Sequence, residues 1–338
     1  MSPDADTLID VRDLQVVFPM EERVARVVHN VSFTVRRGQT LGLVGESGCG
    51  KTMTGLALLQ LIPPPGRVVS GQMLFYAKPD APPLDIATLP PHSDAIRAIR
   101  GAQIAMVFQE PMSSLNPVYT VGQQIAEMVR LHQRLSRQAA HARAVEMLAR
   151  VGIPAPHLRV NDYPHQLSGG MRQRAMIAMA LSCNPKLLIA DEPTTALDVT
   201  VQAQILDLIR DLQTEMGMAV LLISHDLGVI ADLADEVIVM YAGQIVEHGS
   251  AEAVFYRPQH PYTRGLLRSV PSPGRRAQGP LYAIPGTVPG LLAMPAGCAF
   301  GPRCAEQFAQ CQQIPDLHEM TPGHRVRCWA RQESKNGA

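Results

Sequence analysis

The chain has 338 residues, and its 30 lysine and arginine residues are balanced by 30 acidic residues. The resulting net charge of zero gives no electrostatic attraction for nucleic acid or for an anionic membrane surface, which argues against both as partners. The acidic start MSPDADTLID lacks the basic and apolar regions of a signal peptide. Apolar runs such as GLALLQLIP fall short of the roughly 18–20 residues of a membrane-spanning helix. We therefore expect a soluble, cytosolic protein with reduced cysteines.

Strand-like and helix-like segments alternate along the chain. QTLGLVG predicts a buried strand followed by a helix from about Lys51, and the proline-rich stretches 61–67 and 77–92 predict surface loops around a short strand pair. The apolar runs KLLIADEP and MAVLLISHD predict two further buried strands, with a helix between them. EVIVMYAGQIVEHG predicts a hairpin that turns at Ala242 and Gly243. This alternation is typical of an α/β fold whose central strands are buried on both faces.

The amino-acid composition changes after about Pro258, where proline becomes frequent. Eleven of the 28 prolines lie in the last 81 residues, which predicts a loop-rich region with few long helices. We expect one domain over residues 1–258 and a C-terminal extension over 259–338.

GESGCGKT fits the phosphate-binding pattern G-x-x-x-x-G-K-[ST] between a predicted strand and helix. Backbone N–H groups of such a loop surround phosphates, its lysine (Lys51) reaches the β- and γ-phosphates, and its threonine hydroxyl (Thr52) ligates Mg²⁺. The alternative is a glycine turn before an ordinary helix. We expect nucleotide contacts from the whole loop: Gly45, Glu46, Ser47, Gly48, Cys49, Gly50, Lys51 and Thr52.

Asp191 and Glu192 lie at the end of the apolar run LLIA, at the carboxyl edge where open α/β sheets bind ligands. Asp191 is expected to hold Mg²⁺ through water, and Glu192 to polarise the attacking water as general base. Taken alone, the segment is equally consistent with two acidic residues at a strand end.

LSGGMRQR precedes Asp191 by about twenty residues, and together with the phosphate loop it resembles the signature of ATP-binding cassette (ABC) ATPases. Ser168, Gly169 and Gly170 form a second helix start suited to anions. The resemblance implies an α/β P-loop NTPase fold with a RecA-like core, an antiparallel β subdomain and a helical subdomain at about 110–167. It covers about residues 8–258.

The same resemblance implies roles for further residues. Gln109 matches the glutamine that senses Mg²⁺, Asp198 matches the aspartate of the D-loop, and His225 matches the histidine that contacts the γ-phosphate. Phe18 is a candidate for the aromatic ring that stacks on adenine, although a structural strand residue is equally plausible. In this family two cassettes face each other head to tail, which implies that Ser168 serves the partner's nucleotide. We expect an active ATPase.

EPMSSLNPVYTVGQQI, PQHPYTRGLL and IPGTVPGLLAMPAGCAFGPRC resemble the ATPase subunits of oligopeptide and dipeptide importers. This implies a complex of two permease subunits, a second ATPase subunit (a different chain or a copy of this one) and an external substrate-binding protein. It places the chain on the cytoplasmic face of the cell membrane. Importers of nickel, glutathione or opines share much of the pattern, so the cargo stays open. A soluble ABC ATPase acting on nucleic acid or ribosomes, or a redox- or iron-sensing module, is the other alternative.

Four of the six cysteines lie in the last 41 residues: Cys298, Cys304, Cys311 and Cys328. Four thiolates in a reduced compartment suit zinc or an iron–sulfur cluster, and the absence of a tight C-x₂₋₄-C pair favours [4Fe–4S] over Zn²⁺. The alternative is a set of small packing thiols. We expect His260, His318 and His324 to be surface residues. Cys49, near a helix start, is expected to be an acidic thiol whose alkylation blocks ATP binding, and Cys183 a buried one.

Overall fold

The computed structural model describes residues 6–21, 23–79, 81–110, 114–195, 197–270 and 282–332. The chain forms two compact units, each assembled from segments that are distant in the sequence. Unit 1 comprises Met1–Leu8, Val35–Gln39 and Phe75–Leu222, and unit 2 comprises Ile9–Thr34, Thr40–Leu74 and Ile223–Ala338. Segments near both ends of the sequence therefore contribute to unit 2.

Unit 2 contains five neighbouring strands in the order β11-β12-β10-β9-β3. β3 and β9 pair in parallel, with Leu41 opposite Glu236 and Val44 opposite Val239, whereas the other pairs are antiparallel. All of β3 and nearly all of β9 is buried, and each buried valine or leucine side chain contributes about 1.5–3 kcal/mol to stability. The bounds are β3 (Thr40–Val44), β9 (Glu236–Tyr241), β10 (Gln244–Ser250), β11 (His318–Thr321) and β12 (His324–Val326).

The hairpin between β9 and β10 turns where the sequence predicts. Ala242 and Gly243 have φ angles of +47° and +81°, and two successive residues with positive φ form the turn whose twist matches that of the strands it joins.

The pairing of β12 with β10 joins the C-terminal part of the chain to this sheet, with Val326 opposite Glu247. Glu247 is fully buried. It accepts hydrogen bonds from the backbone N–H groups of Gln259 (2.7 Å) and His260 (2.9 Å), and its Oε1 lies 2.8 Å from His324 Nε2. One carboxyl group on β10 thus binds two later segments of the chain.

Three more strands, mostly in unit 2, lie in the order β2-β1-β4. Exposed and buried residues alternate along much of β2, the pattern of a strand with one packed face and one solvated face. These strands are β1 (Thr7–Pro19), β2 (Val24–Arg36) and β4 (Arg67–Phe75). The helices of unit 2 are α1 (Lys51–Leu58), α9 (Leu227–Leu233), α10 (Ala251–Tyr256), α11 (Pro261–Ser269) and α12 (Trp329–Gln332).

Unit 1 contains the strands β6 (Ile104–Val107) and β7 (Leu187–Asp191) and most of β8 (Ala219–Ser224), with β7 between the other two. β6 and β7 pair in parallel, and every residue of the three strands is buried. Uninterrupted burial is typical of strands covered on both faces, so the prediction of buried central strands is confirmed.

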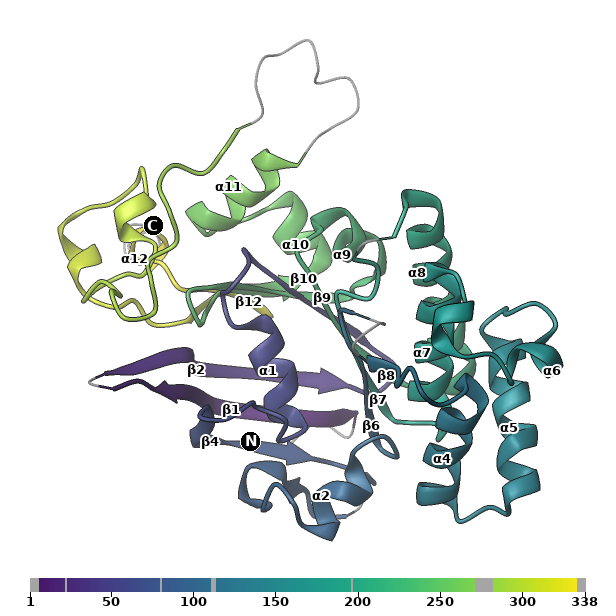
Figure 1. Ribbon diagram of the computed structural model, residues 1–338. Helices are drawn as coiled ribbons and strands as arrows, with labels where there is room; N and C mark the ends of the chain where they lie inside the picture. The colour runs from purple at the N-terminus through teal and green to yellow at the C-terminus, as the bar shows by residue number, and fades with distance from the viewer. Residues whose placement is uncertain are drawn as a thin grey trace. The chain divides into compact units, whose positions relative to one another are not determined.

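The helices α4 and α5 of unit 1 lie side by side in Figure 1, and both contact α7. α4 begins with a capping box between Thr120 and Gln123, and the Ser136 hydroxyl caps α5. The helices of this unit are α2 (Asp94–Ile99), α4 (Val121–Gln133), α5 (Arg137–Arg150), α6 (Pro156–Arg159), α7 (Gly169–Leu181) and α8 (Val199–Met216). Short elements complete the fold: β5 (Leu84–Asp85), η1 (Ile86–Thr88), η2 (Pro164–Gln166), η4 (Gly301–Arg303) and η5 (Ala309–Gln312).

Within the described ranges, no helix is long and apolar enough to cross a membrane.

Candidate functional site

The predicted phosphate loop connects β3 to α1 in unit 2, and its backbone requires glycine at two positions. Gly45 has a φ of +153°, and a Cβ atom there would lie 2.2 Å from the Met240 carbonyl oxygen. Gly50 has a φ of +102°, and its Cβ would lie 2.5 Å from the Val27 carbonyl oxygen. Any larger residue at either position would clash with backbone, so the loop shape depends on both glycines.

Lys51 and Thr52 are the first two residues of α1. The Lys51 side chain is 5% exposed, and its ammonium group donates to the carbonyl oxygens of Gly45 (2.7 Å) and Glu46 (3.1 Å). Ser47 and Gly48 form the exposed tip of the loop. The phosphate loop therefore holds the Lys51 ammonium group, which is expected to bind phosphates at the same loop.

Cys49 differs from the sequence-based expectation. The side chain is 1% exposed, and burial raises the pKa of its thiol above the usual value, despite Lys51 nearby. The expectation of an acidic, reactive thiol was wrong because desolvation outweighs the favourable effect of the lysine and the helix start.

The predicted residues Gln109 and Glu192 both lie in unit 1, where their side chains are in contact. Gln109 follows β6, Glu192 follows β7, and the Gln109 side-chain amide donates to Glu192 Oε2 at 3.0 Å. The Thr195 hydroxyl donates to the same oxygen at 2.9 Å. Because β6 and β7 are neighbouring parallel strands, their carboxyl ends meet at one edge of the sheet. Thr195 is a contact that the sequence analysis did not single out.

Asp191 is the last residue of β7 and is 3% exposed. The next residue, Glu192, has a φ of +47°. A non-glycine residue in this region is uncommon, and such conformations persist where the surrounding structure fixes them.

The predicted signature residues lie at the start of α7. Ser168 is the N-cap residue, and its hydroxyl accepts from the Met171 N–H at 3.3 Å. Ser168 and Gly169 are exposed, and Gly170 is half-buried beside α8, where a Cβ would lie 2.9 Å from a Val201 methyl group. This helix start is thus accessible at the surface of the chain.

Gln173, one turn into α7, is a second residue that the sequence analysis missed. It is 2% exposed, and its amide donates to the Pro193 carbonyl oxygen at 2.5 Å. This bond links the signature helix to the turn that carries Glu192. A polar residue among the buried positions of α7 was the available signal.

The remaining predicted residues are placed as follows. Asp198 is exposed and caps α8 by accepting from the Val201 N–H at 3.0 Å. His225 is exposed and directly follows β8. Phe18 is half-buried near the end of β1, and its ring lies against Gly66. The stacking role of Phe18 stays a prediction.

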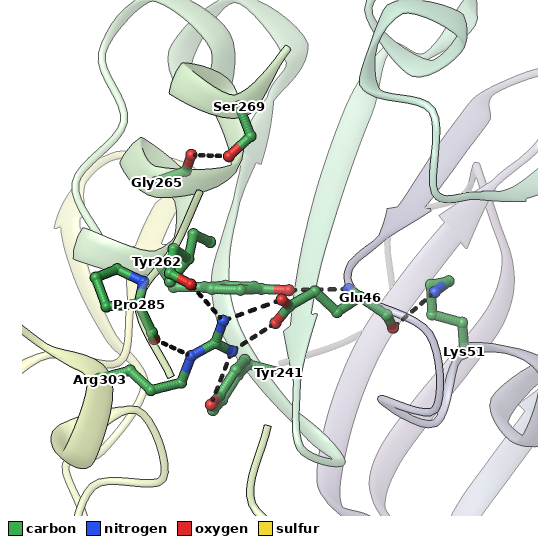
Figure 2. Close-up of polar contacts among 9 residues, drawn as sticks. Glu46, Lys51, Tyr241, Tyr262, Gly265, Ser269, Pro285 and Arg303 are labelled. Carbon is green, nitrogen blue, oxygen red and sulfur yellow. Dashed lines mark hydrogen bonds and ion pairs between the residues drawn. The ribbon is translucent and has the colours of Figure 1, made fainter. Parts of the chain in front are cut away.

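The side chain of Glu46 in the phosphate loop is bound by the C-terminal extension, a contact that the sequence analysis did not predict. Figure 2 shows the Arg303 guanidinium facing the Glu46 carboxylate, with Tyr262 and Tyr241 beside it. The contact could not be predicted from the local sequence around Arg303, because Glu46 lies 257 positions earlier in the chain.

The four clustered cysteines line one small cavity of about 10 Å³. Burial raises the pKa values of Cys298, Cys304 (to about 11) and Cys328. No three of the described His, Cys, Asp or Glu side chains are arranged to hold a single metal ion. Four cysteines are the usual ligands of a thiolate-bound group, but burial disfavours the thiolate form of three of them, and the cavity has room for only about one water molecule.

Two of the three histidines expected at the surface are buried. His260 is 2% exposed and lines the cysteine cavity, and its Nδ1 accepts from the Tyr262 N–H at 3.0 Å. Burial lowers the pKa of His260 to about 4. His324 is 6% exposed beside Glu247. Both were misplaced because no local pattern indicates that the extension pairs with β10.

Two family models match the chain: ABC transporter over residues 28–195, and the C-terminal region of oligopeptide/dipeptide transporters over residues 246–311. The probable peptide ABC transporter ATP-binding protein y4tR of Sinorhizobium fredii is 52% identical over 337 residues, which cover 99% of this chain and 98% of that protein. The oligopeptide transport ATP-binding protein OppD of Bacillus subtilis is 48% identical over 324 residues, or 95% and 88% of the two chains.

Among solved structures, the dimeric ATP-binding cassette MJ0796 in a post-hydrolysis state with ADP and Pi is 26% identical. It aligns with a TM-score of 0.63 and covers 72% of this chain and 99% of that one.

Proposed function

Since the chain belongs to the ATP-binding proteins of the oligopeptide/dipeptide ABC importer family, we propose that it hydrolyses ATP to drive uptake of peptides through a membrane complex. The fold is the α/β P-loop fold of the ABC cassette, with an antiparallel β subdomain, helical parts and the C-terminal region of this family. The observation that best supports ATP hydrolysis is the hydrogen bond between Gln109 and Glu192, because it fixes the position of the expected general base.

Nucleotide binding is assigned to the loop between β3 and α1. Its N–H groups and the start of α1 favour negative charge. Lys51, now bonded to two loop carbonyls, is within reach of phosphates bound by the same loop. Phe18 is proposed, from the family resemblance, as the candidate that stacks on adenine, with a purely structural role as the alternative.

Asp191, Thr52 and Gln109 are the residues proposed to hold Mg²⁺, since hydroxyl, carboxylate and amide oxygens are the donors that this ion prefers. When bound, the ion neutralises charge on the β- and γ-phosphates. Asp191 is suited to a metal because it is a nearly buried carboxylate at the carboxyl end of a strand.

Glu192 is proposed to accept the proton of the attacking water. Gln109 and Thr195 both donate to its Oε2, so the carboxylate is oriented before the reaction begins. His225, exposed at the end of β8, is proposed to contact the γ-phosphate.

Ser168, Gly169 and Gly170 are proposed to bind the nucleotide of a second ATPase subunit, with Asp198 near the same interface. The surface exposure of Ser168 and Gly169 supports this, because an intramolecular ligand site is usually enclosed. ATP would then favour the dimer by binding one state and not the other.

The proposed partners are two permease subunits, a second ATPase subunit and an external substrate-binding protein, with this chain at the cytoplasmic face of the membrane. Peptides are favoured over nickel, glutathione or opines as cargo because the relatives y4tR and OppD are described as peptide and oligopeptide transport proteins.

Uptake in the native cell tests this proposal. Cells that lack the chain should lose accumulation of labelled oligopeptides, and the wild-type chain, but not Glu192→Gln, should restore it. Loss of nickel uptake with intact peptide uptake would overturn the proposal that peptides are the transported substrate. Pull-down of ribosomes or nucleic acid in place of permeases would overturn the transport function.

The four cysteines are proposed to bind a [4Fe–4S] cluster in the extension, with zinc as the alternative. The support is that all four cysteines line one cavity, and in a [4Fe–4S] cluster each cysteine binds a different iron. The chain purified without oxygen should contain iron and matching acid-labile sulfide, both lost in Cys304→Ser. Zinc without iron would indicate a structural zinc site in the extension. A folded, active protein without metal would overturn both the cluster and the zinc assignment.

A further inference from the structure

A carboxylate of the phosphate loop is bound at two points by an arginine of the C-terminal extension. Arg303 Nη1 lies 2.8 Å from Glu46 Oε2, and Nη2 lies 3.1 Å from Oε1 (Figure 2). The Arg303 side chain is 5% exposed and the Glu46 side chain 29%. A two-point pair of this kind fixes direction as well as distance, so the position of the carboxylate depends on the arginine.

Arg303 is held in place by the extension and by the sheet. Its Nε donates to the Pro285 carbonyl oxygen at 2.9 Å, and Nη1 also lies 3.3 Å from the Tyr241 hydroxyl. The guanidinium lies 5.7 Å from the Tyr241 ring centre and 5.9 Å from that of Phe300. Because these contacts fix the guanidinium, the pair with Glu46 loses little conformational freedom when it forms.

The backbone of Glu46 connects this pair to the phosphate-binding lysine. Its N–H donates to the Tyr262 hydroxyl at 2.9 Å, and its carbonyl oxygen accepts from Lys51 Nζ at 3.1 Å. Tyr262 is fully buried and belongs to α11 of the extension. Arg303 and Tyr262 of the extension therefore both bind Glu46, the loop residue that contacts Lys51.

We propose that Arg303 is a positioning residue of the nucleotide site: it holds Glu46, and through Glu46 the phosphate loop and Lys51, in the shape that receives ATP. The extension is then part of the nucleotide site. This inference rests on the proposed role of the loop in ATP binding. Nothing in the pattern of the loop itself requires an arginine 257 positions later.

The test measures ATP affinity by titration calorimetry, in the purified full chain, for wild type, Arg303→Met, Glu46→Gln and the double variant. We expect each single variant to weaken ATP binding about tenfold, and the double variant to be no weaker than either single one, because both remove the same interaction. At saturating ATP, kcat should change less than twofold while KM rises. Arg303→Lys keeps the charge but not the two-point geometry, and should fall between wild type and Arg303→Met.

Arg264→Met is the matched control. Arg264 also lies in the extension, and it pairs with Glu306, which is outside the phosphate loop, so this variant should bind ATP as the wild type does. Thermal unfolding identifies any variant that fails to fold; in that case Glu46→Gln, which leaves the extension unchanged, decides the outcome. ATP affinity within twofold of wild type in Arg303→Met, or additive losses in the double variant, would overturn the inference. Failure of the wild-type chain to bind ATP would instead overturn the proposed function.

Discussion

Gln109 and Glu192 are 83 positions apart, yet the amide of one donates to the carboxylate of the other at 3.0 Å. The contact forms because β6 and β7 are parallel neighbours that end at the same edge of the sheet. It gives the proposed base a defined orientation before any substrate binds.

Glu192→Gln should lower kcat for ATP hydrolysis by at least about 10²-fold, because an amide cannot accept the proton of the attacking water. ATP binding should persist, so an ATP-bound dimer should accumulate. Phosphate release and size-exclusion chromatography with ATP measure both effects. Glu215→Gln, which alters only a surface ion pair with Arg150, is the control. Turnover of Glu192→Gln at the wild-type rate would refute the assignment of the base.

Thr195→Val removes one of the two described donors to Glu192 Oε2 while keeping the side-chain volume. We expect kcat to fall about three- to tenfold with little change in KM. Loss of a hydrogen bond to the charged carboxylate should also move the acidic limb of the kcat–pH profile to higher pH. A merely structural role would leave that limb in place. Thr194→Val, which keeps both donors, is the control.

Cys49 should resist alkylation in the folded protein with and without ATP. The thiol is 1% exposed and burial raises its pKa, so the reactive thiolate is scarce and shielded. Mass spectrometry after timed treatment with iodoacetamide at pH 7.5 measures the modified fraction, and unfolding in urea should expose the thiol. Rapid modification that ATP prevents would show that the loop opens in solution.

The free energy of unfolding should fall as the pH is lowered from about 6.5 to 4. Burial lowers the pKa of His260 from 6.5 to about 4, so across this window the unfolded chain binds a proton that the folded chain does not. The contribution, on the order of 3 kcal/mol, is complete above pH 6.5 and lost as the pH falls through 4. His260→Asn keeps an acceptor for the Tyr262 N–H at the start of α11 and removes the titration. Urea unfolding between pH 4.5 and 7 should give a flatter curve for this variant, and equal slopes would contradict the assignment.

The sequence predicted what depends on short patterns. The buried strands β3, β7 and β8, the turn at Ala242 and Gly243 and the helix that begins at Lys51 all follow from local periodicity or from glycine spacing. The identity of the family followed from the order and spacing of a few motifs, and the comparisons confirm it.

What the sequence could not predict depends on contacts between distant segments. The acidity expected of Cys49 was wrong because burial outweighs the neighbouring charge. The bond between Arg303 and Glu46 joins parts of the chain that no local pattern connects. His260 and His324 were expected in solvent, since a proline-rich stretch gives no periodic signal of pairing with a distant strand.

Through Glu247, the stability of the chain depends on residues close to its C-terminus. A chain that stops before residue 324 would retain this fully buried carboxyl group and lose its contact with His324. Each buried partner lost costs about 1–3 kcal/mol, out of a total stability of about 5–15 kcal/mol. A late nonsense mutation or a proteolytic cut should therefore lower the stability of the whole protein and make it more prone to degradation.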